Sequence, residues 1–146
     1  MNNEKDNVYD LVEDFYAHDE GWNTLLRQEY AEGFLRMEAW KGKKNSDLYR
    51  SWDNLTMLCL YLGSAETFLG DMNADDFIDC IAWCGRNISE FTPDYKNTQD
   101  FLETCDGLFK YLKGKNAISN DTVPATAAEI LLQEGKMNII LDRKST

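Results

Sequence analysis

The 146-residue chain contains only two prolines and one histidine. Because proline breaks helices, so few prolines leave nearly the whole chain free to be helical. The single histidine, His18, lies near Asp14, Asp19 and Glu20, and Asp14, four residues earlier, could orient it for metal binding or acid–base chemistry, but the sequence offers no second histidine. The chain also lacks a serine-centred nucleophile elbow and a glycine-rich phosphate loop. These absences favour a non-enzymatic protein: we identify no catalytic residue and expect no metal and no cofactor.

Long hydrophobic runs are missing as well. The longest apolar stretch, residues 55–62, contains Thr56 and is far shorter than the roughly 20 residues that a membrane span needs. No hydrophobic run follows the first residues, so we expect no signal peptide and no membrane association. The cysteines all lie within apolar helical patterns, which predicts buried, reduced thiols and a cytoplasmic protein. They are Cys59, Cys80, Cys84 and Cys105.

Basic residues are scarce, because 15 lysines and arginines stand against 26 acids and the formal net charge is −11. Residues 1–30 and 61–100 each hold eight acids and two bases, so these two blocks carry almost the whole acidic excess. A duplex-binding surface needs clustered lysines and arginines that face phosphates. The bases gather only in small groups within residues 41–44 and 110–115. Direct nucleic-acid binding is therefore not expected.

Apolar residues recur at the three- and four-residue spacing of helices along most of the chain. This periodicity predicts an all-α fold, a compact bundle of about five to seven helices forming one domain over residues 1–146. We expect the ends, residues 1–6 and 142–146, to be flexible. The expected helices cover residues 8–16, 23–40, 46 to about 69, 74–84, 92–112 and 123–131. The form of the apolar run at 137–141 is left open.

Helix starts and stops can be assigned from single residues. Ser46, Asn73 and Thr92 are expected N-caps, and Pro124 is expected to open the last helix. Glycines are expected to end several helices, and Gly70 is one of them. The central apolar positions of these helices predict the core. They are Leu55, Leu58, Cys59, Leu62, Ile81, Cys105, Leu108 and Leu112.

Two short motifs have the spacing of metal or redox sites. Residues 71–75 follow the D-x-N-x-D opening of a calcium loop, but Asp76 replaces the required glycine and Ala82 the required glutamate. We interpret this segment as a helix N-terminus with dipole-favouring acids. Cys80 and Cys84 share one helical face but lack the two further ligands of a zinc site. We interpret them as core residues.

Aromatic residues are abundant: the chain holds four tryptophans and seven tyrosines. Such side chains are enriched at protein interfaces, because a rigid apolar body carries a polar tip. The region from 22 to 44 combines them with bases, and a narrow apolar stripe leaves some of them without a core position. We therefore predict an interaction surface made of Trp22, Tyr30, Trp40, Lys41, Lys43 and Lys44. The simpler alternative is that Trp40 folds back over the following helix.

Three functions are compatible with these patterns. The first is a non-enzymatic helical module that binds a partner protein or a second copy of itself. The second is an acidic regulator that occupies the nucleic-acid-binding site of its target, using the carboxylates of residues 4–20 and 71–79. The third is a helical protein that binds or hydrolyses a small molecule inside the bundle. The first is the leading prediction.

Overall fold

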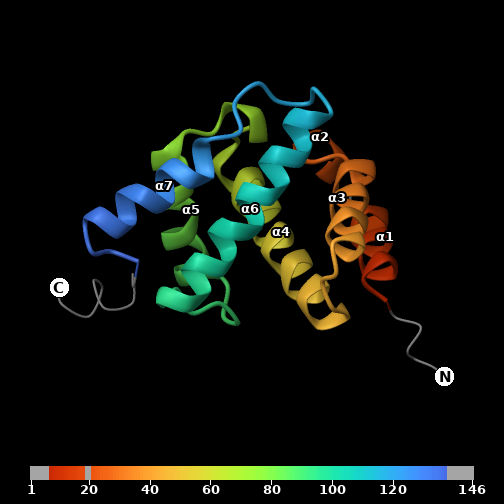
Figure 1. Ribbon diagram of the computed structural model, residues 1–146, viewed down its shortest axis with the longest axis horizontal. Helices are drawn as coiled ribbons and strands as arrows, with labels where there is room; N and C mark the ends of the chain where they lie inside the picture. The colour runs from red at the N-terminus through yellow and green to blue at the C-terminus, as the bar shows by residue number, and fades with distance from the viewer. Residues whose placement is uncertain (1–6, 19–20, 138–146) are drawn as a thin grey trace. The chain divides into compact units, whose positions relative to one another are not determined.

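The computed structural model describes residues 7–18 and 21–137. Over these ranges the chain forms seven α-helices and a single 3₁₀ turn, Leu69–Asp71, with no strand (Figure 1). The predicted all-α fold and helix number are confirmed. The expected flexible ends lie outside the described residues, as does most of the apolar run at 137–141.

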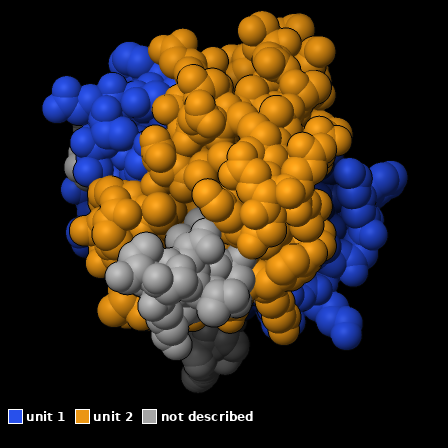
Figure 2. Space-filling model, turned by 90° about the vertical axis from the view of Figure 1, so that its left-hand side faces the viewer, with its two compact units in different colours: residues 1–69 blue, residues 70–146 orange. Residues whose placement is uncertain are grey.

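The chain divides into two compact units, residues 1–69 and residues 70–146 (Figure 2). Unit 1 contains α1 to α4, and α1, α2 and α3 all pack on α4. Unit 2 contains α5 to α7, and α7 packs on both α5 and α6. The expectation of one domain stays a prediction.

Unit 1 is formed by α1 (Val8–His18), α2 (Trp22–Leu25), α3 (Gln28–Trp40) and α4 (Asn45–Ala65). The prediction of one helix over residues 23–40 is wrong, because Leu26 is extended, with φ −151° and ψ 116°. The buried Tyr16 hydroxyl donates to the Leu26 carbonyl at 2.5 Å, and the Asn23 side chain accepts from the Gln28 N–H at 2.8 Å. These side-chain bonds replace helical backbone bonds and stabilise the break.

The ends of α4 differ from those expected. Ser46 lies inside the helix and Lys44 stands at the cap position, so the predicted Ser46 cap is wrong. The helix ends at Ala65, well before Gly70, because Glu66 adopts the left-handed conformation with φ 56°. The N–H of Thr67 then bonds to the Leu62 carbonyl at 3.1 Å and closes the last turn.

Unit 2 is formed by α5 (Ala74–Asn87), α6 (Tyr95–Gly114) and α7 (Val123–Gln133). The Asn73 side chain accepts from the Asp76 N–H, and the Asp76 carboxylate accepts from the Asn73 N–H, both at 2.9 Å. This capping box confirms the Asn73 cap and the interpretation of the acidic segment as a helix N-terminus. Pro124 is the second residue of α7 and opens it as expected.

The predicted Thr92 cap is wrong, because Asp94 caps α6 instead. The Asp94 carboxylate accepts from the Asn97 N–H at 2.9 Å. Pro93 lies outside the helix and is buried. A Cβ atom added at Gly85 would meet Pro93 Cγ at 2.7 Å. Pro93 therefore serves as a packing residue against α5, and the helix begins after it.

The predicted core residues are confirmed, since every one of them is at most 1% exposed. The cysteines are all buried and free, as expected. Aromatic rings complete each core. Phe77 and Phe109 meet edge to face at 5.4 Å in unit 2, and Phe15 and Trp52 do so at 5.3 Å in unit 1.

Candidate interaction sites

Trp22, the first of the predicted surface residues, contributes to the packing of unit 1. Its half-buried ring stacks on Phe15 of α1, with centroids 4.8 Å apart and planes 23° apart. A Cβ atom added at Gly63 of α4 would lie 3.8 Å from the indole. Trp22 thus fills the space between α1 and α4.

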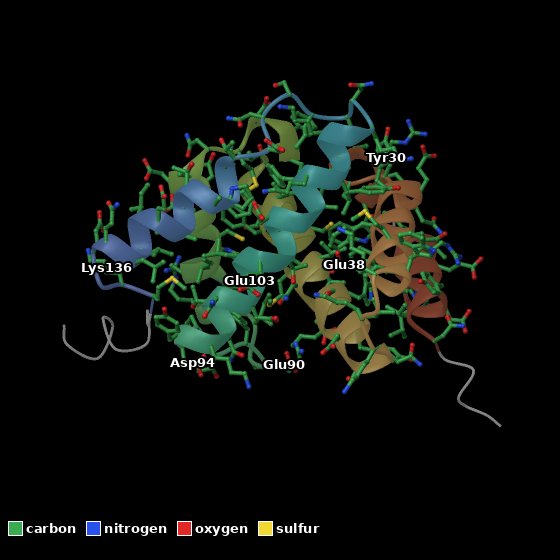
Figure 3. The ribbon with its side chains drawn as sticks, viewed as in Figure 1. Tyr30, Glu38, Glu90, Asp94, Glu103 and Lys136 are labelled. Atoms are coloured by element: carbon green, nitrogen blue, oxygen red, sulfur yellow. The ribbon has the colours of Figure 1, made fainter. Side chains whose placement is uncertain are left out.

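Tyr30 is half-buried on α3, and the Arg27 guanidinium lies 5.9 Å from the centre of its ring. Ten residues separate it from Trp40, which places the two about 15 Å apart along the helix axis. Figure 3 shows Tyr30 and Glu38 toward opposite ends of α3. Tyr30 and Trp40 therefore lie toward opposite ends of α3, and a single surface formed by Trp22, Tyr30 and Trp40 stays a prediction.

Trp40 is the last residue of α3 and is 88% exposed, the highest exposure of any large hydrophobic residue described. It does not fold back over α4. Three exposed bases follow it directly in the chain, Lys41, Lys43 and Lys44. We call these four residues the basic knob.

A Schellman turn holds the basic knob at the end of α3. Gly42 has φ +108°, a value that favours glycine. Its N–H bonds to the Ala39 carbonyl at 3.0 Å, and the Lys43 N–H bonds to the Glu38 carbonyl at 3.1 Å. The Lys43 ammonium also contacts the Glu38 carboxylate at 3.1 Å. The direction of the chain after Trp40 is thus set by backbone and side-chain contacts together.

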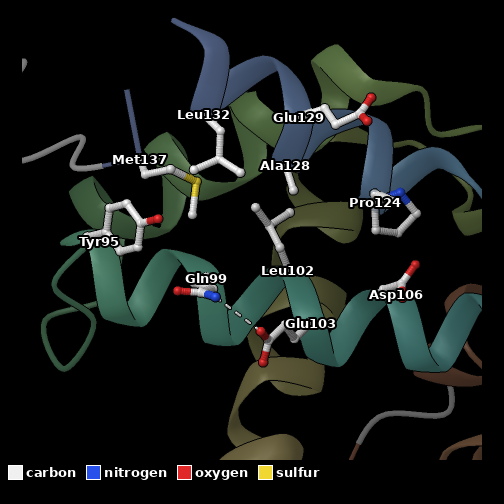
Figure 4. A pocket seen from close by; sticks show the side chains of 11 residues that line it. Tyr95, Gln99, Leu102, Glu103, Asp106, Pro124, Ala128, Glu129, Leu132 and Met137 are labelled. Atoms are coloured by element: carbon white, nitrogen blue, oxygen red, sulfur yellow. Dashed lines mark hydrogen bonds between the residues drawn. The ribbon is translucent and has the colours of Figure 1, made fainter. Parts of the chain in front are cut away.

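A second site, which the sequence patterns did not predict, is an open groove of about 280 Å³ between α6 and α7 (Figure 4). Leu102 of α6, Ala128 of α7 and the buried Met137 contribute apolar surface to it. Tyr95 and Leu132, which also line it, are 49% and 53% exposed. The groove is smaller than the ~300–1,000 Å³ of drug-sized ligand sites and suits one or two side chains.

Carboxylates border this groove. Glu103 and Asp106 come from α6 and Glu129 from α7. The Gln99 amide donates to Glu103 at 3.2 Å, and the Lys110 ammonium contacts Asp106 at 2.7 Å. We call the groove with its three carboxylates the acidic groove.

The turn after α7 builds one wall of the acidic groove. Gly135 has φ +68°, and its N–H bonds to the Leu132 carbonyl at 3.2 Å. The Lys136 N–H bonds to the Leu131 carbonyl at 2.8 Å, which completes a second Schellman turn. The chain then places Met137 in the groove. The sequence indicates this groove only through Leu132, an apolar residue directly after the buried Leu131.

The chemically reactive side chains do not gather in either site. Burial raises the pKa of the Cys59 thiol from 9.0 to about 12 and that of Cys80 well above its usual value. Both thiols are thus neutral and poor nucleophiles. His18 is exposed, and the Asp14 backbone carbonyl that bonds to its Nδ1 at 2.8 Å raises its pKa, helped by the Asp14 carboxylate.

Within residues 7–18 and 21–137, no group of three or more His, Cys, Asp or Glu side chains has the arrangement of a metal site. No helix in these ranges is both long enough and apolar enough to cross a bilayer.

Comparison with protein-family models, curated proteins and solved structures gives no significant match to this chain. Its function can therefore be inferred only from the geometry and chemistry of its own residues.

Proposed function

We propose that this protein is a non-enzymatic interaction module that binds a partner protein through the basic knob. The observation that carries the proposal is the 88% exposure of Trp40 at the end of a well-formed helix. Burying an indole removes about 150–250 Å² of surface from water, which offers roughly 4–6 kcal/mol of gross hydrophobic free energy. Tryptophan is among the residues most enriched at the hot spots of protein interfaces.

The charges around Trp40 define the chemistry of the partner. Lys41, Lys43 and Lys44, all exposed, follow Trp40 closely in the chain, and the Lys43 ammonium contacts the Glu38 carboxylate at 3.1 Å. A complementary partner surface has an apolar hollow for the ring and carboxylates around it. Such charges steer encounter and exclude basic partners more than they add affinity.

The two alternative functions have less support. A regulator that mimics nucleic acid needs freely presented carboxylates, whereas Asp76 is committed to the cap of α5. A small-molecule enzyme needs carboxylates inside a cavity, whereas those of the acidic groove border an open hollow. Exposed apolar anchors with charged rims support binding rather than catalysis.

Capture experiments with matched variants test the proposal. Immobilised wild-type chain and the Phe68→Ala variant, which loses another exposed aromatic of unit 1, should retain the same protein from native lysate. The Trp40→Ala variant should lose it at least tenfold. Its melting temperature should barely change, because substitutions of exposed residues rarely alter stability by more than about 0.5 kcal/mol. Equal capture by all three chains would contradict the proposal.

A further inference from the structure

We infer that a partner of the basic knob is the acidic groove of a second copy of this chain. The inference rests on the proposed function and names the surface that receives Trp40. The two sites lie in different units, one in residues 1–69 and the other in residues 70–146. Each copy therefore carries one site of each kind.

The two sites match in apolar character and size. Trp40 projects a single large ring. The acidic groove offers an open hollow of about 280 Å³ with Leu102 and Met137 within it and Tyr95 and Leu132 exposed beside it. A ring inserted there is contacted by an aromatic, a thioether and aliphatic groups, which are favourable neighbours for an indole. The same insertion covers the exposed parts of Tyr95 and Leu132.

The two sites also match in charge. The basic knob carries three ammonium groups, and the acidic groove carries the carboxylates of Glu103, Asp106 and Glu129. Among the blocks 1–30, 31–60, 61–100 and 101–146, only residues 31–60 hold more bases than acids, five against four. Each copy has a net charge of −11, but salt at 0.15 M screens repulsion beyond about 8 Å. Contacts between the knob and the groove act well within that distance.

The arrangement is head to tail, because two different surfaces meet. Such heterologous contacts make rings when they close and open chains when they do not. One indole and its rim bury much less than the ~1,600 Å² of a standard interface. We therefore expect weak association, with a dissociation constant on the order of 10–1,000 µM.

Sedimentation velocity over a concentration series in 0.15 M salt gives the first test. Wild-type chain and the Phe68→Ala control should associate equally. Trp40→Ala removes the knob and Leu132→Glu places a charge in the groove, so each should weaken association at least tenfold. Leu132 is 53% exposed, so the substituted chain should fold, which circular dichroism checks.

Mixing the two variants gives the decisive measurement. Trp40→Ala still has an intact groove and Leu132→Glu still has an intact knob. Their mixture should form a 1:1 dimer that cannot grow, although neither associates alone. A symmetric contact between two Trp40 side chains gives no such rescue, so absence of the dimer would overturn the inference.

A charge exchange gives an independent test. Lys41→Glu with Lys44→Glu should abolish association, as should Glu103→Lys with Glu129→Lys, and a single chain that carries all four substitutions should associate again. Lys43 is left unchanged because it contacts Glu38. Lys113→Glu with Lys115→Glu, in the other basic group, is the matched control and should associate like wild type.

The inference and the proposed function fail in different ways. A wild-type chain that stays monomeric to millimolar concentration overturns the inference, as does loss of association in Leu132→Glu without loss in Trp40→Ala. The proposed function still stands in both cases if capture from lysate depends on Trp40. The proposed function and the inference both fail only if neither capture from lysate nor self-association depends on Trp40.

Discussion

The ends of α3 in unit 1 and α7 in unit 2 use the same Schellman turn, yet one leaves a projection and the other a hollow. After α3, the residues that the turn brings together are Glu38 and Lys43, which form an ion pair, and Trp40 stays in solvent. After α7, the turn leads to Met137, which is 3% exposed. The backbone motif is shared, and the side chains beside the glycine decide whether apolar surface is buried or presented.

The two regions also differ in the sign of their charge. The turn after α3 presents lysines, whereas the helices beside Met137 present Glu103, Asp106 and Glu129. A strongly acidic chain thus keeps a local basic surface at the end of α3, and the most exposed large hydrophobic residue among those described, Trp40, lies there. This pairing of a base cluster with an exposed indole is what separates unit 1 from unit 2.

The largest effects are expected from cavities in the two cores. Phe34 of unit 1 and Phe109 of unit 2 are each 1% exposed. Replacing either by alanine should lower the free energy of unfolding by about 3–5 kcal/mol. If the two units form one cooperative domain, each substitution should shift the whole urea transition, whether followed by circular dichroism or tryptophan fluorescence. Separate transitions, with only one displaced by each substitution, would contradict the single-domain prediction.

Alkaline pH should weaken both units through their buried thiols. The pKa of Cys59 is about 12 in the folded chain and 9.0 in the free side chain, and burial also raises the pKa of Cys80. Above pH 9 the unfolded chain loses these protons while the folded chain retains them, so stability falls as the pH rises toward 12. For Cys59 this loss amounts to about 1.4 kcal/mol per pH unit between pH 9 and 12, and the raised pKa of Cys80 acts in the same direction.

Urea titrations at pH 8, 9 and 10 measure this dependence. Cys59→Ala in unit 1 and Cys80→Ala in unit 2 should each flatten the slope of stability against pH above 9, whatever they do to stability at neutral pH. An unchanged slope in either variant would show that its thiol is accessible to solvent.

The helices and core were predictable from sequence because local patterns decide them. Periodicity located every long helix, and Asn73 capped α5 as expected. The predicted helix boundaries failed where contacts between residues far apart in the sequence set them. Tyr16 breaks the expected second helix by binding the Leu26 carbonyl, and Pro93 packs against Gly85, so that α6 starts two residues later than Thr92 implied. No local pattern contains these contacts.

The candidate sites were predictable only in part. The sequence placed Trp40 beside three lysines, and the structure leaves it exposed. Trp22, predicted for the same surface, is half-buried and stacks on Phe15. The acidic groove was not foreseen, because it needs α6, α7 and the turn at Gly135 to meet. A hollow between two helices depends on their packing, which periodicity does not describe.

Replacing each of the two turn glycines by alanine should separate the effect of the turn at the basic knob from that of the turn at the acidic groove. Gly42 and Gly135 have φ values of +108° and +68°, and each substitution should destabilise by about 1–2 kcal/mol, with Gly42→Ala the larger. Gly114→Ala, at a glycine without positive φ or close neighbours, should not destabilise. Only Gly42→Ala should also disturb capture by the basic knob, because Gly135→Ala alters the turn beside the groove.

The smallest expected effect comes from Glu66, which ends α4 in the conformation that glycine has after α3 and α7. Its φ of 56° strains a side chain with a Cβ atom by about 1–2 kcal/mol. Glu66→Gly removes this strain but adds freedom to the unfolded chain, so a net gain of about 0.5–1 kcal/mol is expected. Ser64→Gly, two residues earlier in the last turn of α4, should instead lose about 0.5–1 kcal/mol, because glycine disfavours the helical conformation that Ser64 adopts. Urea unfolding of the two variants beside wild type therefore gives shifts of opposite sign. A loss in both would mean that the Glu66 side chain stabilises the end of α4 by more than its backbone strain, and that this third helix end is closed differently from the other two.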